Sequence, residues 1–212
     1  MKFIANFTQR NLTHTVVLNL RMKKLTKNIL KIILLICILG FLFFQFLKSD
    51  LNNPFDENKF NQLKADIENS EALSSDFVKV YKKINPIIST NGILVDGFKN
   101  SSDYRTCPCL NVARSSFIFS DSRILGNQYV LSWKIEKEFT QMQCLNYYVS
   151  NYDFMSQKIG LEQAAVFYFQ KKSDELNEEE MSILSLSLRN SALYNPITNL
   201  EGIKKKLLEL KN

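Results

Sequence analysis

The sequence predicts a mainly α-helical protein, in which one helical domain follows an N-terminal transmembrane helix. The first observation is an almost uninterrupted apolar run at residues 29–47, which at about 1.5 Å per residue can cross a hydrocarbon core. The second is the recurrence of apolar residues at helical spacing in the later segments. The third is a series of polar residues placed where helix N-caps are favoured. The 212 residues suffice for one domain and this appendage.

We interpret the apolar run as an uncleaved single-pass anchor rather than a signal peptide. It ends in FLFFQFLK, without the small-residue cleavage site of a secretory signal. Basic residues and no acidic ones precede it, so the positive-inside rule predicts a cytoplasmic tail at residues 1–28 and an exported domain. Because Met22 opens the segment MKKLTKNILKIILL, residues 1–21 are either an over-called start or part of that tail.

The net charge of +6 belongs to the N-terminal segment. Seven basic residues account for it: Lys2, Arg10, Arg21, Lys23, Lys24, Lys27 and Lys31. Without them the chain has 20 basic and 21 acidic residues, a net charge of −1. Such a domain lacks the basic surface that holds nucleic-acid phosphates, so we do not expect nucleic-acid binding.

Three cysteines lie in the exported part, where disulfides form. We expect Cys144 to pair with Cys107 or Cys109, which leaves one thiol. The single histidine, His14, precedes the span, and three thiolates alone are an incomplete zinc shell. We therefore expect no metal site and no cofactor. Because the exported domain contains no histidine, it also lacks Ser-His and Cys-His catalytic pairs.

Helices are expected over most of the exported domain at residues 57–212, which follows a polar linker at residues 48–56. Asp56 is positioned to cap the first helix, and a second begins at Ser75 or Asp76 and ends before Pro86. Turn signals such as Asn91-Gly92 favour a loop-rich region at 87–106. Further helices are expected at about 109–119, 130–138, 140–149, 161–172, 177–189 and 199–211, with a connector at 152–159.

Residues 160–196, GLEQAAVFYFQKKSDELNEEEMSILSLSLRNSALYNP, resemble the distal part of the peptidoglycan glycosyltransferase domain. This is glycosyltransferase family 51, the transglycosylase part of bifunctional penicillin-binding proteins. Its pattern is G-I-E-A-A-A-x-x-Y-F-G-K, then L-T-x-x-E-A-A-L-L-A, then Y-N-P. The matching positions are Gly160, Glu162, Ala164, Ala165, Tyr168, Phe169, Lys171, Leu176, Glu180, Leu184, Tyr194, Asn195 and Pro196. The resemblance implies a lysozyme-like helical fold and structural roles for Gly160, Glu162, Tyr168, Glu180 and the Tyr194–Pro196 turn.

The same register, carried upstream, places amides where the family has carboxylates. Gln128 stands at the glutamate of R-K-x-x-E, and Asn146 at the acidic position of I-L-E-x-Y-L-N. Asn111 and Arg114 can be laid on Q-L-x-K-N, so Arg114 replaces the lysine that meets substrate phosphate. The resemblance thus implies that Arg114, Asn111, Gln128 and Asn146 are substrate-binding positions.

The motif that supplies the family's catalytic glutamate, E-D-x-x-F-x-x-H, has no counterpart in this sequence. Glu68, Glu71 and Asp76 lie in the corresponding region and are the candidate catalytic carboxylates. Polymerising lipid-linked disaccharides requires a carboxylate base and cations or donors for the departing pyrophosphate. An amide cannot accept the proton, and losing the base costs about 100- to 10,000-fold in rate.

Three functions remain open. The favoured one is a degenerate transglycosylase-like protein of the bacterial cytoplasmic membrane, facing the periplasm, that binds a glycan strand, a lipid-linked precursor or a cell-wall enzyme. The second is a divergent enzyme that polymerises lipid-linked disaccharide with a carboxylate among Glu68, Glu71, Asp76 or Asp103. The third is a membrane-tethered interaction domain without glycan binding.

Overall fold

A computed structural model describes residues 2–99, 104–116 and 124–210, with side chains from Met22 onward. The chain divides into two units, Met1–Asn52 and Asn53–Asn212, which we describe separately. Asp103, one of the candidate carboxylates, lies outside the described residues.

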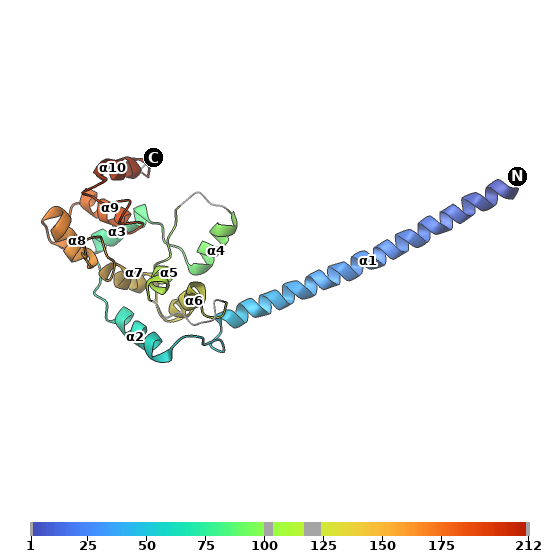
Figure 1. Cartoon of the computed structure of the whole chain (residues 1–212), viewed down its shortest axis with the longest axis horizontal. Helices are drawn as coiled ribbons and strands as arrows, with labels where there is room; N and C mark the ends of the chain where they lie inside the picture. Colours follow the sequence, from blue (N-terminus) through green and yellow to red (C-terminus); the bar gives the residue numbers. More distant parts are fainter. Residues whose placement is uncertain (1, 100–103, 117–123, 211–212) are drawn as a thin grey trace. The chain divides into compact units, whose positions relative to one another are not determined.

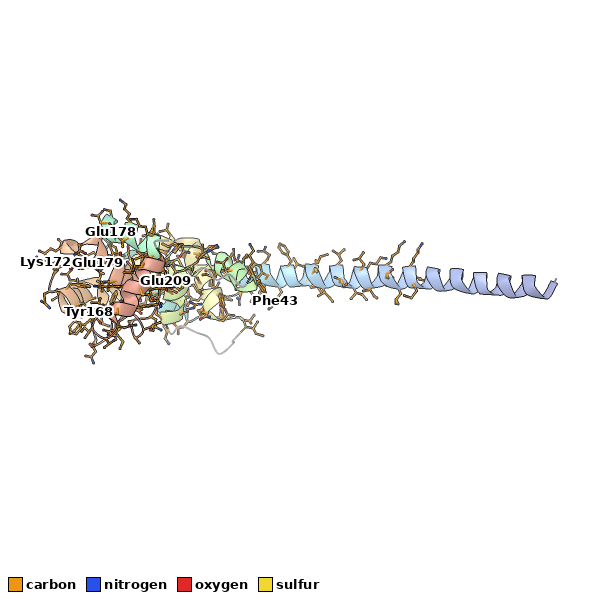
Figure 2. The ribbon with its side chains drawn as sticks, turned by 90° about the horizontal axis from the view of Figure 1, so that it is seen from above. Phe43, Tyr168, Lys172, Glu178, Glu179 and Glu209 are labelled. Atoms are coloured by element: carbon orange, nitrogen blue, oxygen red, sulfur yellow. A yellow bond between two sulfur atoms is a disulfide. The ribbon has the colours of Figure 1, made fainter. Side chains whose placement is uncertain are left out.

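The first unit is a single helix, α1 (Lys2–Lys48). In the part of the chain that the structure describes, Met22–Lys48 is the one segment long and apolar enough to cross a membrane, by length and composition. Its apolar side chains, Phe43 among them, stand out from the ribbon on all sides and are exposed (Figure 2). A helix that is apolar all round is typical of a membrane span. The segment is consistent with a membrane anchor or a signal sequence.

The second unit is built from short helices, and its described residues form no sheet, only isolated bridges at Ile87–Thr106 and Asp153–Ile159. The elements are α2 (Glu57–Glu68), α3 (Ser75–Ile84), α4 (Thr90–Lys99), α5 (Pro108–Ser115), α6 (Gln128–Glu138), α7 (Gln141–Ser150), α8 (Gly160–Phe169), the 3-10 helix η1 (Ser173–Glu175), α9 (Glu178–Ser187) and α10 (Leu200–Glu209). Within the unit, α3 packs on α9, and α5 packs on both α6 and α7 (Figure 1). The mainly α fold predicted from the sequence is confirmed.

Side-chain caps begin three of these helices where the sequence places them. The Asp56 carboxylate accepts from the Lys59 N–H at 2.9 Å at the start of α2. Thr140 and Gln143 form a capping box on α7, and Asn177 and Glu180 form another on α9. Because caps satisfy the free N–H groups of the first turn, they hold these short helices in register.

The expected loop-rich region at residues 87–106 is wrong over its first part, since α4 spans Thr90–Lys99. Contacts from α6 hold the start of this helix. The Thr90 N–H donates to a Glu136 carboxylate oxygen at 2.8 Å, and the Trp133 indole N–H donates to the Asn91 side-chain oxygen at 3.0 Å. The glycines of α4 cost about 1 kcal/mol each in helix propensity, which tertiary contacts of this kind override. The next helix, expected to reach residue 119, ends at Ser115.

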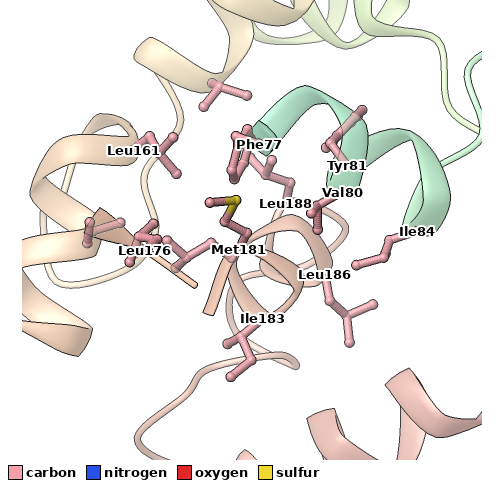
Figure 3. Packing of buried hydrophobic residues seen from close by; sticks show 14 of the residues in the cluster. Phe77, Val80, Tyr81, Ile84, Leu161, Leu176, Met181, Ile183, Leu186 and Leu188 are labelled. Atoms are coloured by element: carbon pink, nitrogen blue, oxygen red, sulfur yellow. The ribbon is translucent and has the colours of Figure 1, made fainter. Parts of the chain in front are cut away.

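The main core of the unit lies between α3 and α9. Figure 3 shows Phe77, Val80, Tyr81 and Ile84 on α3. The same cluster contains Leu161 of α8 and, from α9 and its flanks, Leu176, Met181, Ile183, Leu186 and Leu188. All residues from Ile183 to Leu188 are buried, including Ser185 and Ser187. A helix enclosed on every side must satisfy its polar groups within the protein. The Ser187 hydroxyl does so, since it lies 3.0 Å from the Ile183 carbonyl and 2.6 Å from the Tyr194 carbonyl.

A disulfide joins α5 to α7. Of the two pairings considered for Cys144, the structure has Cys109–Cys144, across 35 residues of sequence, and Cys107 is a buried free thiol. The Gln141 side-chain oxygen accepts from the Cys109 N–H at 3.1 Å, so the first turn of each helix also contacts the other. The cross-link therefore lies inside a packed helix pair.

We predict that Cys144→Ala lowers the free energy of unfolding by about 3 to 4 kcal/mol, because the disulfide closes a loop that is costly to restrain in the unfolded chain. Thermal unfolding of the full chain in detergent measures this. Cys37→Ala, a free cysteine in α1, is the control and should leave the melting of the helical unit unchanged. A non-reducing peptide map in which all three of Cys107, Cys109 and Cys144 are free would reject the cross-link.

Gly160 is the residue at which the connector of residues 152–159 turns into α8. Its φ is +83°, and a Cβ there would lie 2.9 Å from the Ser150 carbonyl oxygen. The Gly160 N–H donates to the Tyr152 carbonyl at 3.0 Å, and the Tyr168 hydroxyl donates to the Phe154 carbonyl at 2.5 Å. The backbone at this corner has no room for a side chain.

Gly160→Ala should therefore destabilise the unit by roughly 1 to 3 kcal/mol, since it combines a left-handed φ with a backbone clash. Gly97→Ala in α4 is a matched control, because an added Cβ meets nothing within 4 Å there. That variant should be neutral or gain up to about 1 kcal/mol. Urea unfolding curves of the two variants should move in different directions from the parent; equal shifts would contradict this explanation of Gly160.

Candidate functional site: a tyrosine–arginine cluster

The three candidate carboxylates within the described chain are all exposed. Glu68 ends α2, Glu71 follows it in the connecting segment, and Asp76 lies in the first turn of α3. Asp76 borders a depression of about 300 Å³, together with Lys79 and Lys83.

Two of the amides implied as substrate-binding positions form hydrogen bonds to residues of other segments. The Asn146 side-chain oxygen accepts from the Leu73 N–H at 3.4 Å, which links α7 to the segment before α3. Asn111 donates to the Thr106 hydroxyl at 3.1 Å. Gln128 is the first residue of α6 and is partly buried. Asn111 and Asn146 thus connect elements.

Arg114 lies on the exposed face of α5, whose opposite face is buried. Its positive charge acts on two tyrosine hydroxyls. Burial raises the pKa of Tyr104 and of Tyr148, and the Arg114 charge acts in the opposite direction on both. The two tyrosines come from the loop before α5 and from α7.

Sequence reasoning missed a second arginine in this region, Arg189, which follows α9. Its Nε donates to the Asn85 side-chain oxygen at 2.7 Å, and an Nη donates to the Ile84 carbonyl. Its guanidinium carbon lies 3.9 Å from the centre of the Tyr104 ring, a stacked cation–π contact. We name Tyr81, Tyr104, Tyr148, Arg114 and Arg189 the tyrosine–arginine cluster.

Tyrosines of α7 and the segment after it fix the backbone that carries Arg189. The Tyr152 hydroxyl donates to the Ser187 carbonyl at 3.1 Å and accepts from the Ser191 N–H at 3.1 Å. The Tyr148 hydroxyl contacts the Leu188 carbonyl at 3.5 Å, and the rings of Tyr148 and Tyr152 lie 5.3 Å apart. Arg189 is consequently held on a rigid turn.

The three tyrosines of the cluster stay protonated at neutral pH. Burial raises the pKa of Tyr81, Tyr104 and Tyr148 above the ordinary value, despite the opposing effect of the nearby arginines. Such hydroxyls can donate hydrogen bonds but cannot take up a proton, and arginine only donates. The cluster therefore combines positive charge with hydroxyl groups, and none of its five members can serve as a general base.

The two glutamates of the distal motif make structural contacts. The Glu162 carboxylate accepts from the Ser173 N–H at 2.9 Å, which lowers its pKa. Glu180 pairs with Lys171 at 2.7 Å and accepts from the Asn177 N–H at 2.9 Å. Burial acts to raise the pKa of Glu180, but Lys171 and the Asn177 N–H hold it below its usual value. Glu162 thus ties the first turn of α8 to η1, and Glu180 ties the segment after α8 to the start of α9.

The Tyr194–Pro196 turn is closed by its own asparagine. The Asn195 side-chain oxygen accepts from the N–H groups of Ile197 at 2.9 Å and Thr198 at 3.3 Å. The Tyr194 N–H donates to the Asn190 carbonyl at 2.9 Å. A search of the described residues for three or more His, Cys, Asp or Glu side chains able to hold a metal ion finds no such group.

Residues 122–211 match the protein family described as Transglycosylase. This stretch, less than half of the chain, is similar to that family, and we call it the transglycosylase region. A biosynthetic peptidoglycan transglycosylase from Acinetobacter baylyi (strain ATCC 33305 / BD413 / ADP1) is 23% identical over 90 residues, which is 42% of this chain and 40% of that protein. The resemblance seen in the sequence is thereby confirmed. The matched region spans less than half of the relative's length.

The tyrosine–arginine cluster straddles the border of the transglycosylase region. Tyr148 and Arg189 lie within the matched residues, whereas Tyr81, Tyr104 and Arg114 precede them. The fold-building contacts of Glu162, Glu180 and the Tyr194 turn all lie inside. The transglycosylase region thus supplies the framework and one arginine of the cluster.

Glu180→Gln should lower the free energy of unfolding at neutral pH by roughly 1 to 2 kcal/mol, because it weakens a charge-assisted bond to Lys171. The pKa of Glu180 is lowered in the folded state. Its contribution to the free energy of unfolding is therefore fully present above the ordinary carboxyl pKa, and it is lost as the pH falls through the pKa of the folded state. Urea unfolding from pH 7 down to about pH 3 should show the gap between parent and variant closing.

Glu179→Gln is the matched control, since Glu179 is an exposed neighbour in the same first turn. It should change stability by no more than a few tenths of a kcal/mol, the size of a helix-dipole effect. Equal destabilisation by both variants, or a Glu180→Gln gap that does not close in acid, would contradict the structural role of Glu180.

Proposed function

We propose that this chain is a membrane-anchored, transglycosylase-like protein of cell-wall assembly that binds a lipid-linked precursor without polymerising it. The observation that carries the proposal is that the residues that build the fold are present while a catalytic carboxylate is not found at the family's positions. The transglycosylase region keeps its fold-building residues, while the cluster beside Arg114 offers cations and hydroxyl donors but no base. A lipid-linked disaccharide carries a diphosphate. Cations and hydroxyl donors bind a diphosphate more strongly than they bind an uncharged glycan strand.

Several carboxylate losses support a binding role over catalysis. The family register has Gln128 and Asn146 at acidic positions, and neither amide can accept a proton at neutral pH. The upstream candidates Glu68, Glu71 and Asp76 are exposed on separate segments. Since a general base contributes about 100- to 10,000-fold to the rate, polymerisation without one would be very slow.

The same proposal places the helical unit outside the cytoplasm of a bacterium, behind an uncleaved anchor. The apolar segment of α1 follows a basic stretch without acidic residues, as the positive-inside rule requires for a cytoplasmic N-terminus. The Cys109–Cys144 disulfide also favours an oxidising compartment. The unit then meets the lipid-linked precursor at the outer face of the membrane, where a cell-wall enzyme could also bind it.

One observation favours a divergent enzyme as a second candidate. Asp76 borders a depression whose lining also includes Lys79, Lys83 and Glu178, and Lys83 pairs with Glu178 at 2.9 Å. A carboxylate and a lysine that forms no ion pair among the described residues, Lys79, thus line the same small space. In this alternative Asp76 is the base and the lysines contact the diphosphate.

For the first proposal, the full chain in detergent should give no polymer from lipid-linked disaccharide, yet bind it. Arg114→Ala should weaken that binding about tenfold, the loss of one charge-assisted contact. Lys204→Ala is the control, because it removes an equal charge from the exposed face of α10. Gel analysis of products and a fluorescence binding assay report the two properties.

Each alternative has its own signature in the same experiment. Polymer that disappears with Asp76→Asn would establish the divergent enzyme and reject the binding proposal. Absence of binding by the parent chain would leave a tethered interaction domain without glycan contact.

A further inference from the structure

An open groove lies between α9 and α10, the last two helices of the unit (Figure 1). Its volume is about 480 Å³, and it is lined by Glu178, Glu179, Ser182, Lys204, Leu207 and Leu208. The two carboxylates come from the first turn of α9, and the lysine and the leucines come from α10. The groove therefore has an acidic side on α9 and a basic and apolar side on α10.

The helix α10 leaves a stripe of apolar surface exposed. Ile203 is the residue of this helix that is buried, whereas Leu200 and Leu208 keep 37% and 63% of their surfaces exposed. These leucines lie four residues before and four residues after Lys204, so the three side chains share one face of the helix. Leu208 also lines the groove, which makes the stripe and the groove continuous. An apolar stripe beside a hollow, with charges at its rim, is typical of a protein–protein contact.

Two opposite charges of the groove are not paired within one copy of the chain. Among the described residues, neither Glu179 nor Lys204 takes part in an ion pair, although both line the groove. Glu178, in contrast, is paired with Lys83 at 2.9 Å. A partner that fits the groove should therefore offer a cation to Glu179 and a carboxylate to Lys204.

We infer that the α9–α10 groove is a contact between two copies of this chain, related by a two-fold axis. In a two-fold contact, a residue i that meets residue j of the other copy is itself matched by j meeting i. Glu179 of each copy then faces Lys204 of the other, and Leu208 of each copy enters the groove of the other. A patch with one charge of each sign beside an apolar centre is complementary to itself, so a second copy supplies both of the charges that the groove calls for.

The contact surface is small, which makes the association weak in solution. Stable interfaces bury roughly 1,200 to 2,000 Å² in total, and a groove with one stripe of leucines falls short of that. Anchoring both copies in one membrane raises their effective concentration without any new contact. The association is therefore expected in a bilayer, while dilution in detergent separates the copies. It does not depend on whether the chain binds a lipid-linked precursor.

The test measures energy transfer between donor-labelled and acceptor-labelled copies of the full chain in phosphatidylcholine vesicles, with the dyes at the N-terminus. The parent should show energy transfer that unlabelled chain competes away. Glu179→Lys alone and Lys204→Glu alone should each weaken association about tenfold, because two like-charge pairs replace two attractive ones. Lys205→Glu is the matched control, since Lys205 is an exposed neighbour that does not line the groove, and it should leave the energy transfer unchanged.

A mixture of Glu179→Lys chains with Lys204→Glu chains separates the contact from an effect on folding. In the mixed pair, position 179 of each copy again faces the opposite charge at position 204, so energy transfer should return to the parent level. Mixing cannot repair a misfolded chain. Parent energy transfer no higher than random dilution gives, or a mixture that does not recover, would overturn the inference. If energy transfer is absent and a dye attached through Leu208→Cys reports a lipid environment, the groove contacts the bilayer and not a second copy.

Discussion

The burial of α9 is the constraint on which the rest of the helical unit depends. Every residue from Ile183 to Leu188 is enclosed, so both apolar contacts and polar partners must be supplied by neighbouring elements. The face of α3 provides most of the apolar contact. Two carbonyl oxygens near the end of the helix are bound, that of Ser185 by the Asn85 side chain and that of Ser187 by the Tyr152 hydroxyl. These contacts fix the position of α9 in the unit and, with it, the position of Arg189, which follows the helix.

This arrangement separates the fold-building contacts at the start of α9 from Arg189 at its end. The start of α9 is held by Asn177, Glu180 and Lys171, whereas its end presents Arg189 to Tyr104. A change in an upstream carboxylate would not disturb either end, because Glu68, Glu71 and Asp76 lie on exposed surface. A chain of this kind can lose a catalytic base and keep the fold. The surviving cations then favour binding as the activity that remains.

Local sequence signals predicted the parts of the structure that depend on neighbouring residues. The Asp56 cap of α2 is of this kind, since its partner, the Lys59 N–H, lies three residues away. The helix α4 was missed because its start is held by Glu136 and Trp133, more than forty residues away. Arg189 was missed for the same reason, as Asn85 and Ile84 are over one hundred residues upstream.

A structure of the full chain with lipid-linked disaccharide and a glycan acceptor bound tests the central claim most directly. The account predicts that the diphosphate lies within hydrogen-bond distance of Arg114. It also predicts that no carboxylate lies within about 3.2 Å of the acceptor hydroxyl. A carboxylate of Glu68, Glu71 or Asp76 within that distance would contradict it, because the chain would then hold a base in place for the transfer.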